Sequence, residues 1–239
     1  MKPLADRPLI GVIGGVGPLA TAYFLRRVIE STAAQVDQDH LDLLVFNHAA
    51  IPDRTRHLLD RSQPDPGPVL AADARRLEGF GCDFLVMPCN TAHTYTQQVQ
   101  DAVTVPFVSI IDVTVAAARA RLPGLRQVGL LATAGTVAAG VYDDAFAPDV
   151  VVLTPSAVDQ QRVDRLITQV KAGVHVGRQE VDSVAASLRE RGAELVLLGC
   201  TELSVIAVDQ GLLAEPTYLD TLDCLVRATI KRAGAQVRG

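Results

Sequence analysis

The sequence predicts an α/β protein built from two similar lobes, each a mostly parallel sheet flanked by helices. Short apolar runs that end in small or polar residues alternate with helix-length segments, as in parallel sheets buried on both faces. Three segments of the first half recur in the same order in the second half: 10–15 at 128–133, 84–93 at 195–204, and 108–114 at 216–221. We therefore expect a pseudo-two-fold relation between the lobes, with the active site in the cleft between them.

The first half of the chain contains the elements of one lobe. Leu9 to Ile13 reads as a buried strand, and a helix is expected from Leu19 to Ala34. Pro18 suits the first turn of that helix because its missing N–H is not needed there. The other expected elements are strands over 41–46, 84–88 and 103–108 and helices over 69–78 and 113–122.

The second half repeats this plan. Strands are expected over 128–131, 150–153 and 195–198, and helices over 159–171, 180–191 and 220–233. The last helix mirrors residues 112–122 and is expected to pack back on the first lobe. The predicted lobes are therefore residues 1–107 together with 212–239, which carry Cys89, and residues 108–211, which carry Cys200.

Composition and charge restrict the class of protein. With 49% hydrophobic residues, 4% aromatic residues and no tryptophan, the chain has the aliphatic character of α/β proteins. A formal net charge of −5, without a cluster of lysines and arginines, argues against nucleic acid as a partner. The apolar runs are too short to span a membrane and the first residues contain no signal-peptide core, so we expect a cytoplasmic protein with no membrane partner.

Two of the four cysteines stand at the ends of predicted strands. Cys89 and Cys200 each precede a helix start, where backbone N–H groups and the helix dipole lower a thiol pKa from its usual value of about 8.5. Cys82 and Cys224 fit the ordinary role of small buried apolar side chains. In a cytoplasmic chain of this size we expect all four to be reduced.

Two other roles for the cysteine pair fit the spacing less well. A metal site would combine Cys89, His93 and Cys200, but zinc usually takes a closer pair of ligands and a fourth ligand is not evident. We therefore expect no metal. A disulfide would require the two sulfur atoms to touch, and neither cysteine belongs to a Cys-x-x-Cys pair.

A glycine-rich loop follows the first predicted strand. Its pattern, Gly15-x-Gly17-x-x-Ala20, matches part of a dinucleotide-binding fingerprint. The second part of that fingerprint is an acidic residue at the end of the second strand, but that strand ends in Asn47. We therefore reject a dinucleotide cofactor and interpret the loop as a helix start that can bind an anion.

Two cationic side chains are further candidates for the site. Arg54 lies in a polar loop after the second strand, where it either holds a ligand carboxylate in a bidentate fork or pairs with Asp53 on the surface. Lys171 falls in the last turn of a predicted helix, where its ordinary role is to complement the helix dipole. The spacing alone does not decide between these roles.

Symmetry favours an acid–base role for Cys89 and Cys200. Two thiols that face each other across a bound carbon acid can act as a base on one face and as an acid on the other, which inverts a stereocentre without a cofactor. Each sulfur should approach the carbon to roughly 3–3.5 Å, which places the two sulfur atoms roughly 6–8 Å apart, too far for a bond.

The motifs resemble those of the aspartate/glutamate racemase family, and most closely its aspartate racemase branch. Five motifs carry the resemblance over nearly the whole chain: GVIGGVGPLAT (11–21), IPDRT (51–55), PCNTAH (88–93), VKAG (170–173) and LGCTEL (198–203). The resemblance implies a two-lobed α/β fold, usually a homodimer, with a small amino acid as substrate. It also implies two-thiol chemistry that needs no pyridoxal phosphate.

The resemblance further implies roles for individual residues. Cys89 and Cys200 would be the catalytic pair, with Cys200 as the base for the L-enantiomer and Cys89 as the base for the D-enantiomer. The substrate-binding residues would be Asn90, Thr91 and Thr201 for the α-carboxylate, and Arg54 and Lys171 for the side-chain carboxylate, with Thr133 as a further candidate.

The leading function is therefore the interconversion of L- and D-aspartate without a cofactor. The alternative on the same fold is racemisation of glutamate or another amino acid. Val16 stands where the family commonly has methionine, and a smaller side chain there can change the preferred substrate size. From a different class, a non-catalytic protein that binds small dicarboxylates would also have two lobes around a cleft.

Overall fold

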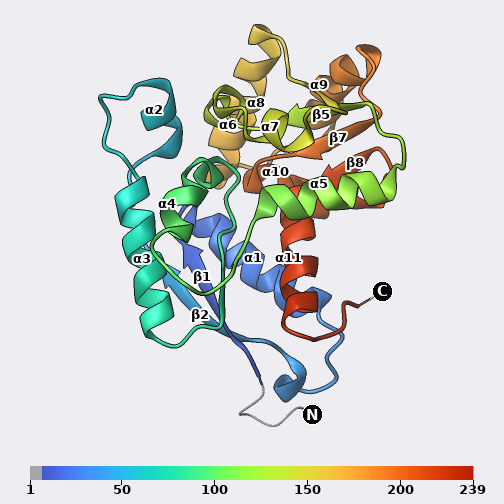
Figure 1. Cartoon of the computed structure of the whole chain (residues 1–239). Helices are drawn as coiled ribbons and strands as arrows, with labels where there is room; N and C mark the ends of the chain where they lie inside the picture. The colour runs from blue at the N-terminus through green and yellow to red at the C-terminus, as the bar shows by residue number, and fades with distance from the viewer. Residues whose placement is uncertain (1–6, 239) are drawn as a thin grey trace.

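The structure is a computed structural model that describes residues 7–238, and it contains two four-stranded sheets of parallel strands (Figure 1). The first sheet has the order β2-β1-β3-β4 and the second has the order β6-β5-β7-β8, so both follow the same topology. This confirms the predicted two-lobed α/β class. The strands are β1 (Leu9–Gly14), β2 (Asp42–Asn47), β3 (Phe84–Val86), β4 (Phe107–Val108), β5 (Gln127–Leu131), β6 (Val151–Leu153), β7 (Leu195–Leu198) and β8 (Tyr218–Asp220).

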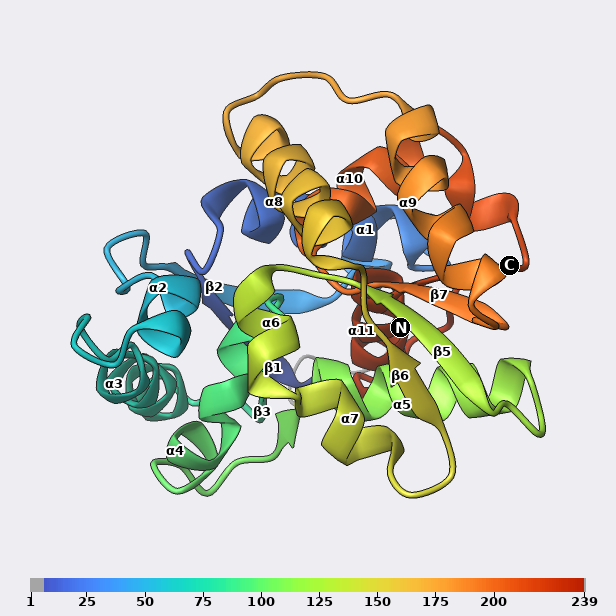
Figure 2. The ribbon, with the colours of Figure 1, turned by 90° about the horizontal axis from the view of Figure 1, so that it is seen from above.

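Helices flank both sheets (Figures 1 and 2). The α-helices are α1 (Pro18–Ser31), α2 (Arg54–Leu59), α3 (Gly67–Gly79), α4 (Thr96–Gln100), α5 (Ile110–Arg121), α6 (Ala134–Ala139), α7 (Val141–Phe146), α8 (Ala157–Lys171), α9 (Arg178–Glu190), α10 (Thr201–Asp209) and α11 (Thr221–Arg232). Within residues 7–238 the short 3₁₀-helices are η2 (Asp37–Asp39), η3 (Thr91–Tyr95) and η4 (Leu212–Ala214). Within residues 7–238, no helix combines the length and the apolar character needed to cross a membrane.

Alternate residues of the central strands face two different apolar cores. In β3, Phe84 and Val86 belong to a core that both lobes share, whereas Leu85 between them packs in a separate core of the first lobe. Strands β1, β5 and β7 likewise place some side chains in the shared core and the others in a core of their own lobe. Burial on both faces explains why these strands read as continuous apolar runs in the sequence. The shared core includes residues of α1, α5, α7 and α11, so apolar packing joins the two lobes.

The last strand and helix of each half connect the lobes. Strand β4 completes the first sheet, but α5 after it packs against α7 and β8 of the second lobe. Strand β8 completes the second sheet, and α11 after it packs against α1 and β4 of the first lobe. We expected the whole of residues 212–239 to belong to the first lobe. In the structure β8 pairs with β7 in the second sheet, whereas α11 packs on the first lobe.

The two lobes also meet where α2 lies beside α6 (Figure 2). Thr55 of α2 donates a hydrogen bond to Thr133 at the start of α6, with 3.4 Å between the hydroxyl oxygens. Gly135 permits this approach, because a Cβ built on it would lie 2.8 Å from the Cα of Thr55. The close packing of backbone on backbone places Arg54, the first residue of α2, beside the second lobe.

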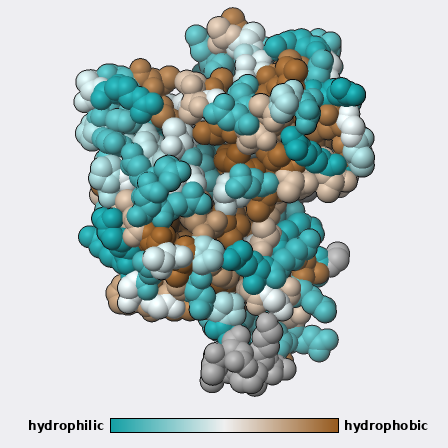
Figure 3. Space-filling model, in the orientation of Figure 1, coloured by the Kyte–Doolittle hydropathy of each residue, from teal (hydrophilic) through white to brown (hydrophobic). Residues whose placement is uncertain are grey.

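The surface differs between the two lobes. On the face shown in Figure 3, hydrophobic residues gather over the upper lobe around α5, α6 and α7, whereas hydrophilic residues dominate over α2 and α3. Val113 of α5, Val137 of α6 and Val141 of α7 are partly exposed while they pack on the shared core.

Replacing Gly135 with alanine should lower the free energy of unfolding by about 1–3 kcal/mol, because the added methyl group forces α6 away from the backbone of α2. Urea denaturation measures this change. Gly79→Ala is the matched control, since a Cβ there meets no atom within 4 Å. The control variant should be neutral or more stable by about 0.4–1 kcal/mol. Equal stabilities of the two variants would contradict tight packing at this contact.

Candidate active site

A small cavity lies between the lobes at the carboxyl ends of β3 and β7. Its volume of about 30 Å³ is enough to hold a water molecule. All eight residues that the sequence predicted for the site line this one cavity. The lining residues are Val16, Asp53, Arg54, Thr55, Cys89, Asn90, Thr91, Thr133, Lys171, Gly199, Cys200, Thr201 and Glu202.

The two cysteines occupy equivalent positions in the two lobes. Cys89 follows β3 and Cys200 follows β7, and these strands are the third in the order of their sheets. Both residues are buried, with 8% and 7% of their surface exposed, and both are free thiols. Cys200 is the N-cap residue of α10, whereas Cys89 is followed by the 3₁₀-helix η3. The repeat of the fold therefore brings one thiol from each lobe to the same cavity.

Cys200 donates a hydrogen bond to a carboxylate. Its Sγ lies 2.9 Å from Oε2 of Glu202, and Oε1 of the same carboxylate is 4.0 Å from Nζ of Lys171. Burial, and after it the negative charge of Glu202, raises the pKa of the Cys200 thiol well above its ordinary value, while Lys171 opposes this change. We expected the helix start to lower this pKa. The expectation was wrong because burial and the adjacent carboxylate outweigh the helix N-terminus.

Cys89 is held in place through its backbone. Nδ1 of His93 donates to the carbonyl oxygen of Cys89 at 2.7 Å, and the N–H of Ile110 donates to Nε2 of His93 at 3.0 Å. Complete burial lowers the pKa of His93 to about 4, so the ring is neutral near pH 7. Because backbone groups use both ring nitrogens, His93 has no lone pair left for a metal. It connects Cys89 to the start of α5.

Arg54 lines the cavity and has a buried N–H without a partner among the described residues. Its Nη1 donates to the carbonyl oxygens of Pro52 and Ile51 at 3.1 and 3.4 Å, and its Nε is buried without a partner among residues 7–238. Asp53 does not neutralise it but caps α2 instead, accepting the N–H of Arg56 at 2.8 Å. A guanidinium with an unused buried N–H can bind a ligand carboxylate in a charge-assisted hydrogen bond.

Threonine hydroxyls from both lobes form a cluster at one side of the cavity. Oγ1 of Thr91 lies 3.1 Å from Oγ1 of Thr133 and 2.8 Å from Oγ1 of Thr136. Thr201 donates to Oε2 of Glu202 at 3.3 Å. These predicted site residues therefore have hydrogen-bond partners within the protein as well as a place in the cavity wall.

The amide of Asn90 bonds to other protein side chains, which limits the carboxylate-binding role that we expected. Its Nδ2 donates to Thr221 at 3.0 Å, and its Oδ1 accepts a hydrogen bond from Tyr142 at 2.5 Å. One N–H of the amide remains for other contacts, so Asn90 has less capacity to bind a carboxylate than its position in the sequence indicated.

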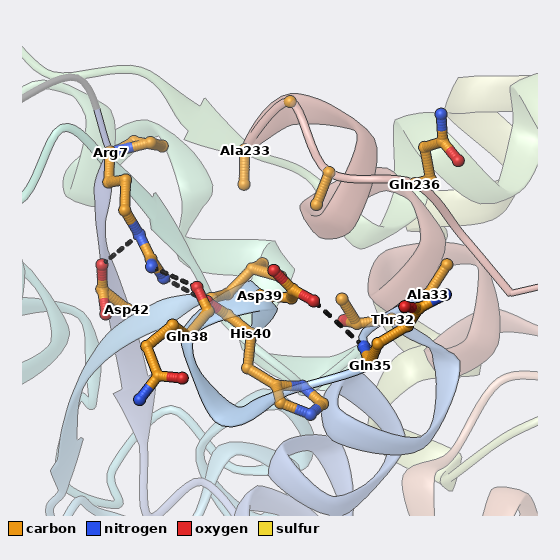
Figure 4. Close-up of a pocket in the computed structure, with 14 residues that line it drawn as sticks. Arg7, Thr32, Ala33, Gln35, Gln38, Asp39, His40, Asp42, Ala233 and Gln236 are labelled. Atoms are coloured by element: carbon orange, nitrogen blue, oxygen red, sulfur yellow. Dashed lines mark hydrogen bonds and ion pairs between the residues drawn. The ribbon is translucent and has the colours of Figure 1, made fainter. Parts of the chain in front are cut away.

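A larger cavity of about 450 Å³ lies at the amino ends of β1 and β2, away from the cysteines (Figure 4). Arg7 there pairs with Asp42 at 2.9 Å, and Asp39 accepts the N–H of Gln35 at 3.1 Å. The charged groups of this cavity are thus paired within the chain, and no cysteine lines it. The smaller cavity between the lobes is the candidate active site.

Comparisons with known proteins agree with the fold and the motifs. The chain belongs to the Asp/Glu/Hydantoin racemase family, whose model matches residues 13–229. It is similar to an aspartate racemase from Picrophilus torridus, with 29% identity, a TM-score of 0.85, and coverage of 97% of this chain and 96% of that one. It is also similar to the broad specificity amino-acid racemase RacX of Bacillus subtilis, with 26% identity over 93% of this chain and 96% of that protein. A glutamate racemase from Desulforudis audaxviator is 30% identical over 66% of this chain and 60% of its own length.

Sequence reasoning assigned no role to Glu202. The signal was its position two residues after Cys200, which places a carboxylate in the first turn of the helix that the cysteine begins. An acidic residue in a first turn is ordinarily explained by the helix dipole. Only the folded arrangement shows that its carboxylate accepts a hydrogen bond from the thiol of Cys200.

The structure predicts how Glu202 controls the thiol. Glu202→Gln keeps an acceptor oxygen but removes the charge that raises the pKa of Cys200, so Cys200 should react faster with iodoacetamide near neutral pH. Each unit of pKa changes the thiolate fraction about tenfold. Peptide mass spectrometry over a pH series measures the rate, with Glu180→Gln on the exposed start of α9 as the control. Identical pH profiles in both variants would show that Glu202 does not act on the thiol.

Proposed function

We propose that the protein is a cofactor-independent racemase that interconverts L- and D-aspartate by a two-base mechanism. The observation that carries this proposal is that Cys89 and Cys200, from equivalent strand ends of the two lobes, line one cavity. Membership of the Asp/Glu/Hydantoin racemase family supports the reaction class. A thiol on each face of a bound amino acid is the minimum machinery for removing and returning an α-proton.

The groups around the substrate can supply or accept the proton that each step requires. Cys200 first transfers its thiol proton to the carboxylate of Glu202. The thiolate then takes the α-proton of L-aspartate, and the electron pair is delocalised into the α-carboxylate. The thiol of Cys89 delivers its proton to the opposite face, which gives D-aspartate and leaves Cys89 as a thiolate. The starting state returns when Cys89 takes up a proton from water and Glu202 releases one.

Cations in the cavity support an acidic substrate. Arg54 has an unused buried N–H, and the half-exposed Lys171 lies near the cavity on the second lobe. We infer that Arg54 and Lys171 bind the side-chain carboxylate, while Thr91 and Thr201 bind the α-carboxylate.

The range of substrates is the main alternative within this function. The similarity to RacX and to glutamate racemases keeps glutamate and other amino acids as candidates. Val16 is a buried part of the cavity wall, so its size helps to decide which side chain fits. A protein that only binds dicarboxylates is the alternative from another class, and it would need the cationic side chains but neither thiol.

The first test is incubation of the reduced protein with L-aspartate in D₂O without pyridoxal phosphate. We expect loss of optical rotation together with deuterium at the α-carbon. Cys89→Ala and Cys200→Ala should each lower the racemisation rate by about 10²–10⁴-fold, the usual contribution of a general acid or base. Cys82→Ala, which removes a buried thiol outside the cavity, is the control and should retain the rate.

The possible outcomes of this test separate the alternatives. Exchange with glutamate or a neutral amino acid but not with aspartate would transfer the function to that substrate. Binding of aspartate without exchange of the α-proton, unchanged in Cys89→Ala, would establish a binding protein instead of a racemase.

Arg54→Gln should raise the KM for aspartate by roughly 10–100-fold, because it removes a charge-assisted hydrogen bond of about 1.5–3 kcal/mol. Initial rates over a range of aspartate concentrations measure this. Arg56→Gln is the matched control, since Arg56 is an exposed arginine on the same helix. A similar KM in both variants would exclude Arg54 as the carboxylate ligand.

A further inference from the structure

A path of buried hydrogen bonds connects the backbone beside Cys89 with the backbone beside Cys200. Asn90, which follows Cys89, donates from Nδ2 to Oγ1 of Thr221 at 3.0 Å. The hydroxyl of Thr221 donates in turn to the carbonyl oxygen of Leu198 at 3.0 Å, two residues before Cys200. The path therefore joins the ends of β3 and β7 directly across the lobes.

The available protons determine which group donates and which accepts in each hydrogen bond of this path. Thr221 has one hydroxyl proton, which it gives to Leu198, so it must accept from Asn90. The amide of Asn90 is oriented further by Tyr142, whose hydroxyl lies 2.5 Å from Oδ1. Thr221 and Tyr142 are fully buried and Asn90 is 2% exposed, so loss of a partner in this path costs more than at the surface.

Helix capping does not explain the hydroxyl of Thr221. Thr221 is the first residue of α11, but the side chain of Asp220 caps that helix by accepting the N–H of Leu222 at 3.1 Å. Neither Thr221 nor Tyr142 lines the cavity between the lobes. The hydroxyl of Thr221 therefore serves the connection between the two strand ends and does not touch a ligand.

We propose that Thr221 is a positioning residue that sets the separation of the Cys89 and Cys200 thiols. Tyr142 supports this role because it holds the amide of Asn90 in place. This inference rests on the proposed racemase function. The two sulfur atoms have to approach opposite faces of one carbon at the same time, and a displacement of about 1 Å can lower a rate about 10²-fold. A direct hydrogen-bonded path between the two strand ends limits such displacement.

The test compares Thr221→Val, which has the shape of threonine without its hydroxyl, with Thr221→Ser, which keeps the hydroxyl. Thr221→Val should lower kcat for racemisation by roughly 10–100-fold and leave KM within about threefold, because the substrate contacts are retained. Thr221→Ser should restore most of the rate. In D₂O, Thr221→Val should also show more α-deuteration relative to inversion, because one thiol still removes the proton while the other is misplaced.

Thr229→Val is the matched control. Thr229 is also fully buried on α11, and its hydroxyl donates to the carbonyl oxygen of Leu225 at 2.7 Å, away from both cysteines. Thermal unfolding should show a similar loss of stability in both valine variants, but only Thr221→Val should lower kcat. Equal kcat values for Thr221→Val and Thr229→Val would overturn the proposal.

Two further measurements keep the inference separate from the proposed function. Tyr142→Phe removes the donor to Asn90 Oδ1, and its effect on kcat should be less than additive with that of Thr221→Val, since both variants loosen the same amide. The short bis-alkylating reagent 1,3-dibromoacetone should join Cys89 to Cys200 in the wild type and in Thr229→Val but less in Thr221→Val. This crosslink needs no turnover. Equal yields would refute the positioning role, and absence of racemisation in the wild type would refute only the proposed function.

Discussion

The apolar core shared by the two sheets is the constraint on which the rest of the structure depends. One face of each sheet packs into this core, together with helices from both lobes. Because the two sheets have the same strand order, the carboxyl ends of β3 and β7 are equivalent positions on either side of the contact. A side chain at the end of each strand therefore reaches the same cavity. The crossed packing of α5 and α11 strengthens this arrangement, since each half of the chain contributes a helix to the other lobe.

The cavity between the lobes combines burial with charge. Burial favours the neutral form of a thiol, and Cys200 accordingly has a raised pKa and donates a hydrogen bond to Glu202. Such a thiol needs a proton acceptor in contact with it before it can act as a base. The carboxylate of Glu202 provides that acceptor, and Lys171 lies near its second oxygen. Cys89 is held differently, through its backbone and the neutral ring of His93. The two thiols are thus equivalent in topology but not in their electrostatic surroundings.

Much of the fold was predictable because it depends on local patterns. Apolar runs ending at Cys89 and Cys200 indicated buried parallel strands, and the repeated order of segments indicated two lobes. Cys89, Cys200 and the polar residues directly after them followed from the rule that side chains at the carboxyl ends of strands gather at one edge of a sheet. Lys171, at the end of α8, and Thr133 were expected only from the resemblance to the racemase family. The assignment of β8 to the wrong lobe had a different cause, because a strand of three residues has too little local pattern by itself to indicate which sheet it joins.

The sequence by itself determined the two-lobed α/β class, the strand ends that carry the cysteines, and the polar residues beside them. These features follow from periodicity and from the residue types at element boundaries, which are local properties. Only the tertiary structure decided the partners of the buried polar groups. The contact of Cys200 with Glu202, the raised pKa of that thiol, and the bonds of Asn90 to Tyr142 and Thr221 depend on packing. Asn90 and Thr221 are 131 residues apart in the chain, and no pattern within either segment specifies that they meet.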